Sequence, residues 1–295
     1  MNTHTLIAGL LLGSTPLPLT AAPDIFPKPQ QVNLQDNYTR VSSVSLNLRK
    51  PDSSGAMWEQ LPADNPGAYA LEVSPGSLSI WANCDEGLYY AKQTLSQMLR
   101  GVEGAQNAQR DPFPDTPLPA VAIQGELPIG TVIDWPDLPF RGAVAGYYGA
   151  PWSFEARKSQ FDFYGRNKLN TYIYAPKDDP YHHGLGCYQP YPADKAEELR
   201  QLVLHARRNH VRFVWAIHPA NTVKWEENGG KTQLDGLCHK LQLMYDLGVR
   251  DFGVLVDDSS GEIGRAERQV QLCNYILENF IRKHPDVNQT LIMCP

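Results

Sequence analysis

Strand-like and helix-like segments alternate from about residue 140 onwards, and this alternation limits the possible folds more than any other feature of the sequence. The strand-like segments are apolar along most of their length, which is typical of strands buried on both faces of a parallel sheet. Apolar stripes between them predict amphipathic helices. The predicted strands are 141–147, 171–174, 212–217, 252–256 and 290–294, and the predicted helices are 153–166, 193–209, 231–247 and 262–283.

Repeated strand–helix units predict an α/β fold with a parallel sheet, for which we expect a (β/α)8 TIM-type barrel. Such a barrel needs about 250 residues, whereas the segment 137–295 holds the strands and helices of only part of one. We therefore expect the barrel to be present only through about strand 5. A small α+β domain is predicted before it at 23–136, with a hairpin around the turn at 74–77 and a helix over 86–100.

The N-terminal sequence indicates the localisation of the protein, and the net charge limits the classes of partner that it can bind. An apolar run at 6–13 is followed by small residues, and it is too short to span a bilayer. It predicts a secretory signal peptide at 1–22, and hence a secreted or periplasmic protein without a membrane span. The net charge of −6 argues against nucleic acid and anionic membranes as partners, because both require a basic patch.

The cysteines do not indicate a disulfide framework or a metal site. Their number is odd and their spacing is wide and irregular. No cysteine–histidine cluster has the spacing of a zinc site, so we expect isolated buried thiols and no metal. The five cysteines are Cys84, Cys187, Cys238, Cys273 and Cys294.

Residues that could carry chemistry follow the ends of the predicted strands. Active-site groups of (β/α) barrels lie at the C-terminal ends of the strands, so these residues are expected to converge on one rim. Lys177 could bind sugar hydroxyls or form a local salt bridge, and His218 could be a general base, a ligand or a structural histidine. His182 and His183 are interpreted as a loop feature. The rim residues are Gly146, Tyr148, Trp152, Lys177, His218, Asp257 and Asp258.

Asp257 and Asp258 are adjacent, although neighbouring residues of a strand point to opposite faces of the sheet. Both can face a ligand only where the strand ends and the chain turns, here at 259–261. Two nearby carboxylates also raise one of their pKa values, which suits a general acid at neutral pH. The alternative is an exposed acidic turn after a strand.

Three segments together resemble glycoside hydrolase family 84, the O-GlcNAcase-like β-N-acetylglucosaminidases. They are GAVAGYYG at 142–149, NKLNTYIYAPKDDPYH at 167–182 and FGVLVDDSSGE at 252–262. The resemblance implies that Asp257 and Asp258 form the catalytic dyad and that Lys177 contacts the substrate. It also implies that the carbonyl of Gly146 faces the sugar and that Tyr148 lines the pocket.

The resemblance further implies a mechanism and a substrate. In family 84 the 2-acetamido oxygen of the substrate attacks the anomeric carbon and forms an oxazoline, with retention of configuration. Asp257 would orient the acetamide N–H, and Asp258 would protonate the leaving oxygen and then deprotonate water. The implied activity is that of a retaining exo-β-N-acetylglucosaminidase acting on GlcNAc-bearing glycans or glycoproteins, without a metal or other cofactor. Ala145 replaces the usual Glu of the family, a change interpreted as tuning the site.

Two other functions stay open. A C-terminally truncated barrel could be a non-catalytic GlcNAc-binding protein or a degenerate fragment, and we expect a chain of 295 residues to be poorly active by itself. A family 20-type β-hexosaminidase would carry an Asp-Glu pair where this chain has Asp257 and Asp258.

Overall fold

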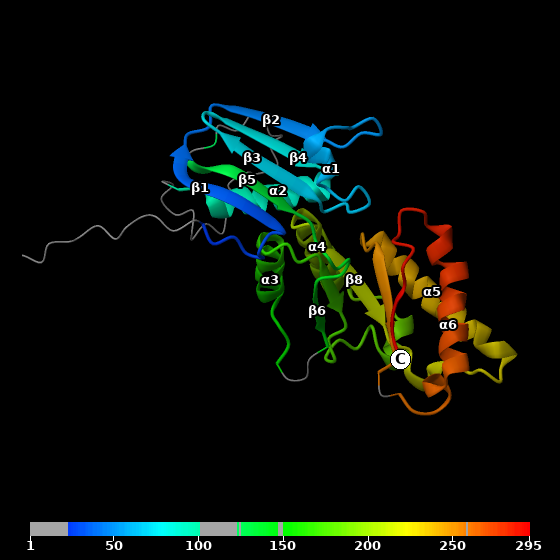
Figure 1. The fold of residues 1–295 in the computed structure, drawn as a ribbon. Helices are drawn as coiled ribbons and strands as arrows, with labels where there is room; N and C mark the ends of the chain where they lie inside the picture. The colour runs from blue at the N-terminus through cyan, green and yellow to red at the C-terminus, as the bar shows by residue number, and fades with distance from the viewer. Residues whose placement is uncertain (1–22, 101–122, 124, 147–149, 258) are drawn as a thin grey trace, which may run out of the picture.

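The computed structural model describes residues 23–100, 123, 125–146, 150–257 and 259–295. Two units follow each other along the chain, and each is built on its own five-stranded sheet (Figure 1). The predicted signal peptide, Tyr148 and Asp258 lie outside the described residues. Within those ranges, no helix combines the length and the hydrophobicity that crossing a bilayer requires.

The N-terminal unit is a mixed sheet in the order β1-β5-β3-β4-β2, with one helix packed against it. The predicted hairpin is confirmed by the antiparallel pairing of β3 with β4 around Gly76, whose φ of 78° suits a residue without a side chain. The elements are β1 (Gln31–Thr39), β2 (Ser43–Leu48), α1 (Ala56–Glu59), β3 (Tyr69–Ser74), β4 (Ser77–Ala82), α2 (Asp85–Met98) and β5 (Leu127–Asp134).

The second unit is a parallel sheet in the order β10-β9-β8-β7-β6, and helices connect its strands. The strands are rich in β-branched and aromatic residues, which suit a pleated, buried surface. α3 begins after Ser153, whose hydroxyl accepts a hydrogen bond from the Ala156 N–H. The main elements are β6 (Gly142–Ala145), α3 (Phe154–Arg166), β7 (Thr171–Tyr174), α4 (Ala193–Arg208), β8 (Arg212–Ile217), α5 (Lys231–Asp246), β9 (Asp251–Leu255), α6 (Ala266–Asn279) and β10 (Ile292–Cys294).

Most predicted bounds of this unit agree with the structure. The strands predicted at 171–174 and 212–217 are confirmed as β7 and β8. The helix predicted at 262–283 is wrong in extent, because α6 is flanked by 3-10 turns at Glu262–Gly264 and Ile281–Lys283. The backbone of Arg265 is extended and that of Phe280 is non-helical, so the regular helix ends on both sides.

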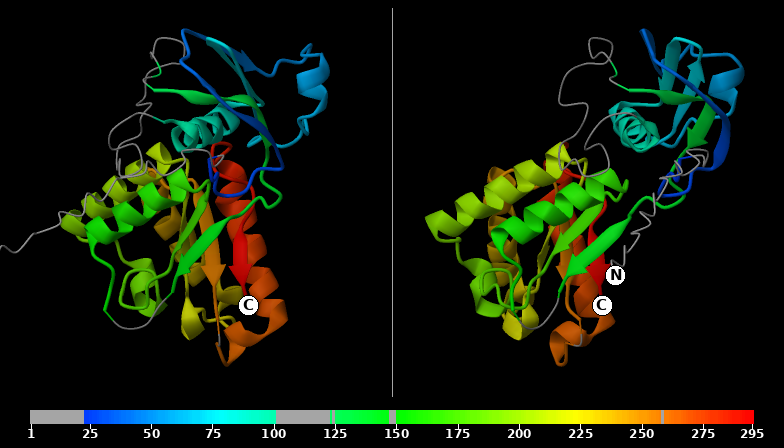
Figure 2. Two further views of the ribbon diagram at one scale, coloured as in Figure 1. Left: turned by 60° about the vertical axis from the view of Figure 1, so that its left-hand side comes forward. Right: turned by 90° about the vertical axis from the view of Figure 1, so that its left-hand side faces the viewer.

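The two faces of the parallel sheet have different neighbours. Helices α3 to α6 lie on the outer face, and the sheet curls away from them (Figure 2). Outward-pointing Tyr172, Trp215 and Phe252 pack with those helices in the largest core of the chain. Inward-pointing side chains form a separate small cluster of Ile173, Ala175, Ala216 and Leu255. The inner face of the strands therefore carries a small apolar cluster of two alanines, one isoleucine and one leucine.

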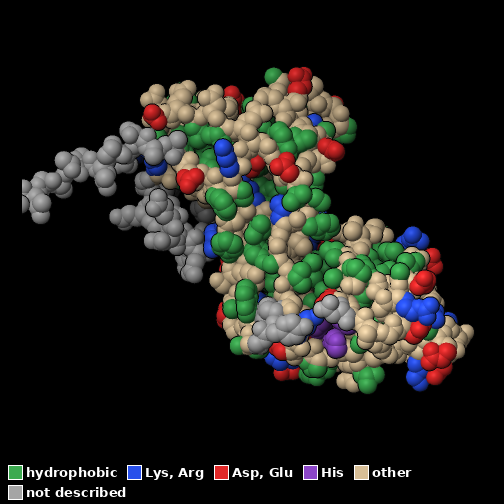
Figure 3. Space-filling view, turned by 60° about the horizontal axis from the view of Figure 1, so that its bottom comes forward, with side chains coloured by type: hydrophobic (Ala, Val, Ile, Leu, Met, Phe, Trp, Pro, Cys, Tyr) green, Lys and Arg blue, Asp and Glu red, His purple; other side chains and the backbone are tan. Residues whose placement is uncertain are grey.

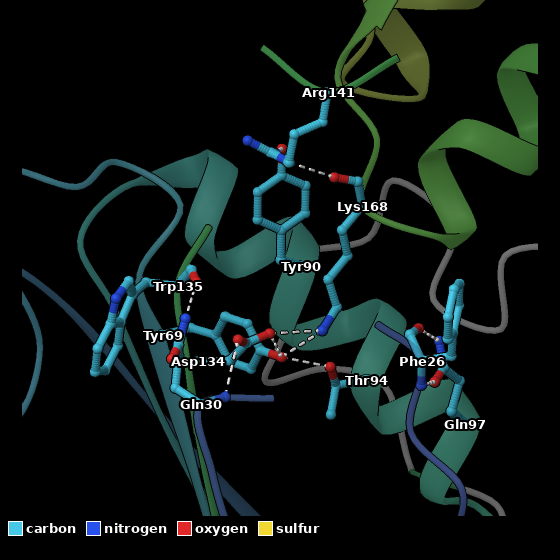
Figure 4. Close-up of polar contacts among 10 residues, drawn as sticks. All are labelled: Phe26, Gln30, Tyr69, Tyr90, Thr94, Gln97, Asp134, Trp135, Arg141 and Lys168. Carbon is cyan, nitrogen blue, oxygen red and sulfur yellow. Dashed lines mark hydrogen bonds and ion pairs between the residues drawn. The ribbon is translucent and has the colours of Figure 1, made fainter. Parts of the chain in front are cut away.

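The N-terminal unit contacts the N-terminal ends of the parallel strands through a buried ion pair (Figure 4). Lys168, which directly precedes β7, donates hydrogen bonds to the Asp134 carboxylate at 2.9 Å and to the Tyr69 hydroxyl at 2.7 Å. Tyr69 also pairs with the Thr94 hydroxyl. Burial lowers the pKa of Lys168, and the nearby carboxylate of Asp134 opposes that shift.

A second contact between the units lies beside the first. Arg141, just before β6, donates to the Tyr90 hydroxyl of α2 at 2.7 Å and to the Lys168 carbonyl at 3.0 Å (Figure 4). The ring of Tyr89 stacks on His210, which precedes β8, with ring centroids 4.1 Å apart. The residues before β6, β7 and β8 thus hold the N-terminal unit, and the opposite ends of these strands face away from it (Figure 2).

Candidate active site

The predicted rim lies at the C-terminal ends of β7, β8 and β9. Figure 3 shows this end of the molecule turned toward the viewer, where histidine side chains lie beside acidic and basic ones. The floor below the rim belongs to the inner face of the sheet, where Ala175, Ala216 and Leu255 pack together.

Lys177 and Asp257 form an ion pair across the rim, with Nζ 2.8 Å from Oδ2. They follow β7 and β9, and β8 lies between these two strands in the sheet. The pair therefore spans the end of β8, a width of about 10 Å between outer strand axes. The side chains are 26% and 33% exposed, so a ligand on the inner face can reach both.

The charge of Asp257 is stabilised by its neighbours. Partial burial opposes ionisation of this carboxyl. The hydrogen bond from Lys177, a backbone hydrogen bond and the charge of Lys177 outweigh that effect and hold the pKa of Asp257 below its usual value. Asp257 is consequently a carboxylate at neutral pH, able to accept hydrogen bonds but not to donate a proton.

Asp179 anchors the loop that carries Lys177. It is buried, and its carboxylate accepts hydrogen bonds from the Tyr174 hydroxyl at 2.8 Å, the Tyr191 hydroxyl at 2.7 Å and the Tyr181 N–H at 2.7 Å. Burial raises the pKa of both Tyr174 and Tyr191, which keeps their hydroxyls protonated as donors. Asp179 thus holds the loop after β7 in place through these hydrogen bonds. Lys177 forms its ion pair with Asp257 and not with the neighbouring Asp179.

Lys240 of α5 lies beneath the same loop and is fully buried. Its ammonium lies 4.1 Å from the ring centroid of Tyr191 and donates to the Gln189 carbonyl. Burial lowers the pKa of Lys240 to about 8, and the charge of Asp179 opposes the shift. Neither Asp179 nor Lys240 was among the predicted site residues, because the partners of Asp179 depend on how the loop after β7 folds and those of Lys240 are distant in sequence.

His182 and His218 are parts of one backbone pairing. The His218 N–H donates to the His182 carbonyl at 2.8 Å, and the Gly184 N–H donates to the His218 carbonyl at 2.8 Å. His182 is buried and its Nε2 pairs with the Pro176 carbonyl at 2.8 Å. The interpretation of His182 as a loop feature is therefore incomplete, since it joins the loop after β7 to the end of β8.

Gly146 lies on the same rim, beside the end of β7. A Cβ placed on Gly146 would come 4.0 Å from the Ala175 carbonyl oxygen. Trp152 is exposed on the segment before α3. Of the predicted site residues, the structure brings Gly146, Lys177 and Asp257 to one end of the sheet, and Tyr148 and Asp258 lie outside the described residues.

Neither a disulfide nor a metal site is found among the described residues of the chain. All five cysteines are free thiols. Cys187 is buried, but the expectation of buried thiols is wrong for Cys84 and Cys294, which are exposed before α2 and on the edge strand β10. In the described ranges, no three His, Cys, Asp or Glu residues group in a way that could hold a metal ion.

Comparisons of the sequence and of the fold with known proteins both identify relatives among the β-N-acetylglucosaminidases. A family model described as beta-N-acetylglucosaminidase matches residues 141–295. The chain is 32% identical over 158 residues to protein O-GlcNAcase from Rattus norvegicus and to that from Mus musculus. Each match covers 52% of this chain and 17% of the relative, so the chain corresponds to a small part of those proteins.

Two solved structures resemble the chain over both of its units. The structure of CpGH84B superposes with a TM-score of 0.73 at 26% identity, and that of CpGH84D with 0.71 at 25% identity. Each covers 92% of this chain and 50% of the solved chain. The family match extends over more than half of the sequence and includes the rim that carries Lys177 and Asp257. The chain therefore belongs to the β-N-acetylglucosaminidases of glycoside hydrolase family 84.

Proposed function

We propose that the protein is a retaining exo-β-N-acetylglucosaminidase that removes terminal β-linked GlcNAc by substrate-assisted catalysis. The observation that carries this proposal is the Lys177–Asp257 pair on the inner rim of the parallel sheet. A carboxylate held ionised on a partly exposed rim suits an uncharged ligand that offers N–H and O–H groups. A GlcNAc residue has both kinds of donor.

Asp257 would act on the acetamide group of the substrate. As a carboxylate it accepts a hydrogen bond from the acetamide N–H, which orients the acetamide oxygen toward the anomeric carbon and stabilises the positive charge that develops in the oxazoline. Lys177 supports this role because it keeps the pKa of Asp257 low. In the bound state Lys177 is also proposed to donate to a sugar hydroxyl.

Asp258 would be the general acid and base. It protonates the glycosidic oxygen while the acetamide oxygen attacks, and it then removes a proton from the water that opens the oxazoline. Two adjacent carboxylates suit this division, because the ionised one disfavours ionisation of the other. Gly146 and Tyr148 are proposed to complete the sugar-binding wall.

The substrate class is proposed to be GlcNAc-bearing glycans or glycoproteins. The two curated relatives are named protein O-GlcNAcase, which supports GlcNAc attached to protein as one source. We further propose that β6 to β10 are the first five strands of a (β/α)8 barrel, since the chain covers half of each of the two solved family 84 chains. Export directed by residues 1–22 is part of the same proposal.

Leaving-group dependence tests the assignment of Asp258 as general acid. Asp258→Asn is expected to lower kcat/KM at least about 100-fold for an aryl β-GlcNAc with a poor leaving group. The loss should be much smaller for a dinitrophenyl glycoside, which departs without protonation. Asp257→Asn should be slow on both substrates, because the acetamide has lost its partner.

Asp246→Asn, which alters an exposed carboxylate of α5, is the matched control and should behave like the unmodified protein. Equal losses of Asp258→Asn on both substrates would contradict the general-acid role. A protein that binds GlcNAc but hydrolyses neither substrate would instead be a non-catalytic GlcNAc-binding protein.

A further inference from the structure

β8 lies between the two strands that position the Lys177–Asp257 pair. Every second residue of an extended strand points to the same face. Ala175 and Leu255 lie on the inner face two residues before Lys177 and Asp257, and Ala216 lies on it two residues before His218. The same period places His218 on the inner face, at the end of the strand that the ion pair spans.

Hydrogen bonds fix which nitrogen of His218 carries the proton. The Ala220 N–H donates to Nδ1 at 3.1 Å, so Nδ1 must be an acceptor. A neutral imidazole with an acceptor at Nδ1 carries its hydrogen on Nε2. The backbone of the residue is held on both sides by His182 and Gly184, and the ring is held by the Ala220 N–H and by contact with the ring of His183.

The Nε2–H of His218 is a donor that the surrounding protein leaves available. The residue is only 6% exposed, yet across the described parts of the chain no hydrogen bond to Nε2 accompanies the one at Nδ1. Nε2 is not among the fully buried polar atoms that lack a partner, so a ligand can reach this donor. A ligand oxygen placed on the inner face would satisfy it.

The environment also keeps the ring neutral. Burial lowers the pKa of His218 to about 4. His183, whose ring centroid lies 4.5 Å away, and Lys177 and His182 add to this effect, while Asp257 opposes it. The ring can therefore donate one hydrogen bond at neutral pH without adding charge, which suits a hydroxyl oxygen better than an anion.

We propose that His218 is a further substrate-binding residue, whose Nε2–H donates a hydrogen bond to a hydroxyl oxygen of the sugar bound above the inner face. This inference rests on the proposed function, because it assumes a GlcNAc residue in the same pocket. His218 would thus add a third substrate contact. It follows β8, which lies between the strands that precede Lys177 and Asp257. This inference also selects the substrate-contact role among the alternatives that the sequence leaves open for this histidine.

A pair of amide variants separates this role from a structural one. The side-chain nitrogen of Gln reaches about as far as the imidazole Nε2, whereas the Asn amide reaches only as far as Nδ1. Both can accept from the Ala220 N–H. In the full chain, His218→Asn is expected to lower kcat/KM for an aryl β-GlcNAc about 10-fold or more, whereas His218→Gln should stay within about 3-fold of the unmodified protein.

Monodeoxy analogues of the aryl β-GlcNAc identify the hydroxyl. The unmodified protein should lose activity on each analogue that lacks a bound hydroxyl. His218→Asn should show no further loss on one of these analogues, because the partner of that hydroxyl is already absent. His239→Asn, which removes an exposed histidine of α5, is the control and should follow the unmodified protein on every analogue.

The outcomes distinguish this proposal from the proposed function. If the unmodified protein hydrolyses the substrate and His218→Asn does so equally well, or if its loss is the same on every analogue, His218 binds no sugar hydroxyl. A nitrogen-15 spectrum with the proton on Nδ1 of His218 would overturn the proposal in the same way. If the unmodified protein neither hydrolyses nor binds GlcNAc, the proposed function fails and this inference fails with it.

Discussion

At the scale of single residues, the rim holds two neighbouring titratable groups in defined and different charge states. Asp257 is ionised because Lys177 donates a hydrogen bond to it. His218 is neutral because it is buried among other positively charged or protonatable groups. One group is therefore an acceptor and the other a donor over the same range of pH, which allows both to bind one uncharged ligand.

Removing Lys177 should change how activity depends on pH. In Lys177→Met the pKa of Asp257 rises, since the hydrogen bond and the positive charge that lower it are lost. The proposed mechanism requires Asp257 as a carboxylate, so the acid limb of kcat/KM should move to higher pH, and kcat/KM at neutral pH should fall about 10- to 100-fold. The measurement is kcat/KM for an aryl β-GlcNAc from about pH 3 to pH 8.

Lys224→Met is the control for this prediction, because Lys224 forms an exposed ion pair with Glu227 and not with Asp257. Its acid limb should coincide with that of the unmodified protein. An acid limb of Lys177→Met that stays in place, or moves to lower pH, would show that Lys177 does not set the charge of Asp257.

At the scale of elements, regular strands and helices could be predicted wherever one face is continuously apolar. β7 and β8 are short apolar runs, and their predicted bounds are correct. β1 and β5 were not predicted. β1 is an edge strand with mostly exposed residues, and β5 contains Pro128 and Gly130. Gly130 is required there because a Cβ would come 2.0 Å from the Asn33 carbonyl oxygen, a contact that only the folded sheet reveals.

The candidate site could be predicted where it depends on strand ends and not where it depends on packing. Lys177 and Asp257 follow predicted strands, so their convergence on one rim could be expected. The pairing of Asp179 with Tyr191, and the position of Lys240 beneath them, could not. The first contact depends on how the loop after β7 folds, and the second forms only when α5 packs against that loop.

Lys240→Met tests the cost of burying a lysine in α5. The unfolded chain binds a proton at Lys240 up to about pH 10.4, whereas the folded chain releases it near pH 8. Between these values unfolding takes up a proton, so raising the pH favours the folded state, by at most about 1.4 kcal/mol per pH unit. The free energy of unfolding should therefore rise from pH 7 to about pH 9.5 in the unmodified protein, relative to Lys240→Met.

Urea unfolding at several pH values provides the measurement. At pH 7 the methionine variant should be at least as stable, because it avoids the desolvation of an ammonium. Lys231→Met is the control on the same helix, since Lys231 is exposed and pairs with Asp235. Identical pH profiles for Lys240→Met and the unmodified protein would mean that Lys240 titrates like an exposed lysine.

At the scale of the whole molecule, a buried ion pair joins the two units. Lys168 and Asp134 come from different units, and both are largely inaccessible to solvent. Breaking a buried pair leaves one charge without a partner, which costs more than the loss of an exposed pair. The segment 167–182 therefore contributes to both ends of the parallel sheet, with Lys168 at the N-terminal unit and Lys177 at the rim.

Lys168→Met should destabilise the chain by about 3–5 kcal/mol, because Asp134 is left buried and uncompensated. Adding Asp134→Asn should recover part of this loss, which urea unfolding of the single and double variants would measure. Lys158→Met, which removes a partly exposed pair with Glu155, should cost less than about 1 kcal/mol. A loss for Lys168→Met no larger than that of Lys158→Met would show that the pair does not hold the units together.

The placement of the N-terminal unit has a consequence for the size of the substrate. This unit contacts the starts of β6, β7 and β8, whereas Lys177 and Asp257 follow the ends of their strands. The described part of the N-terminal unit consequently lies at the end of the parallel sheet opposite the rim and does not cover it (Figure 2). A bulky ligand can therefore approach Lys177 and Asp257 without meeting the described part of that unit, and tethering the protein to a solid support through its N-terminal unit would leave this approach open.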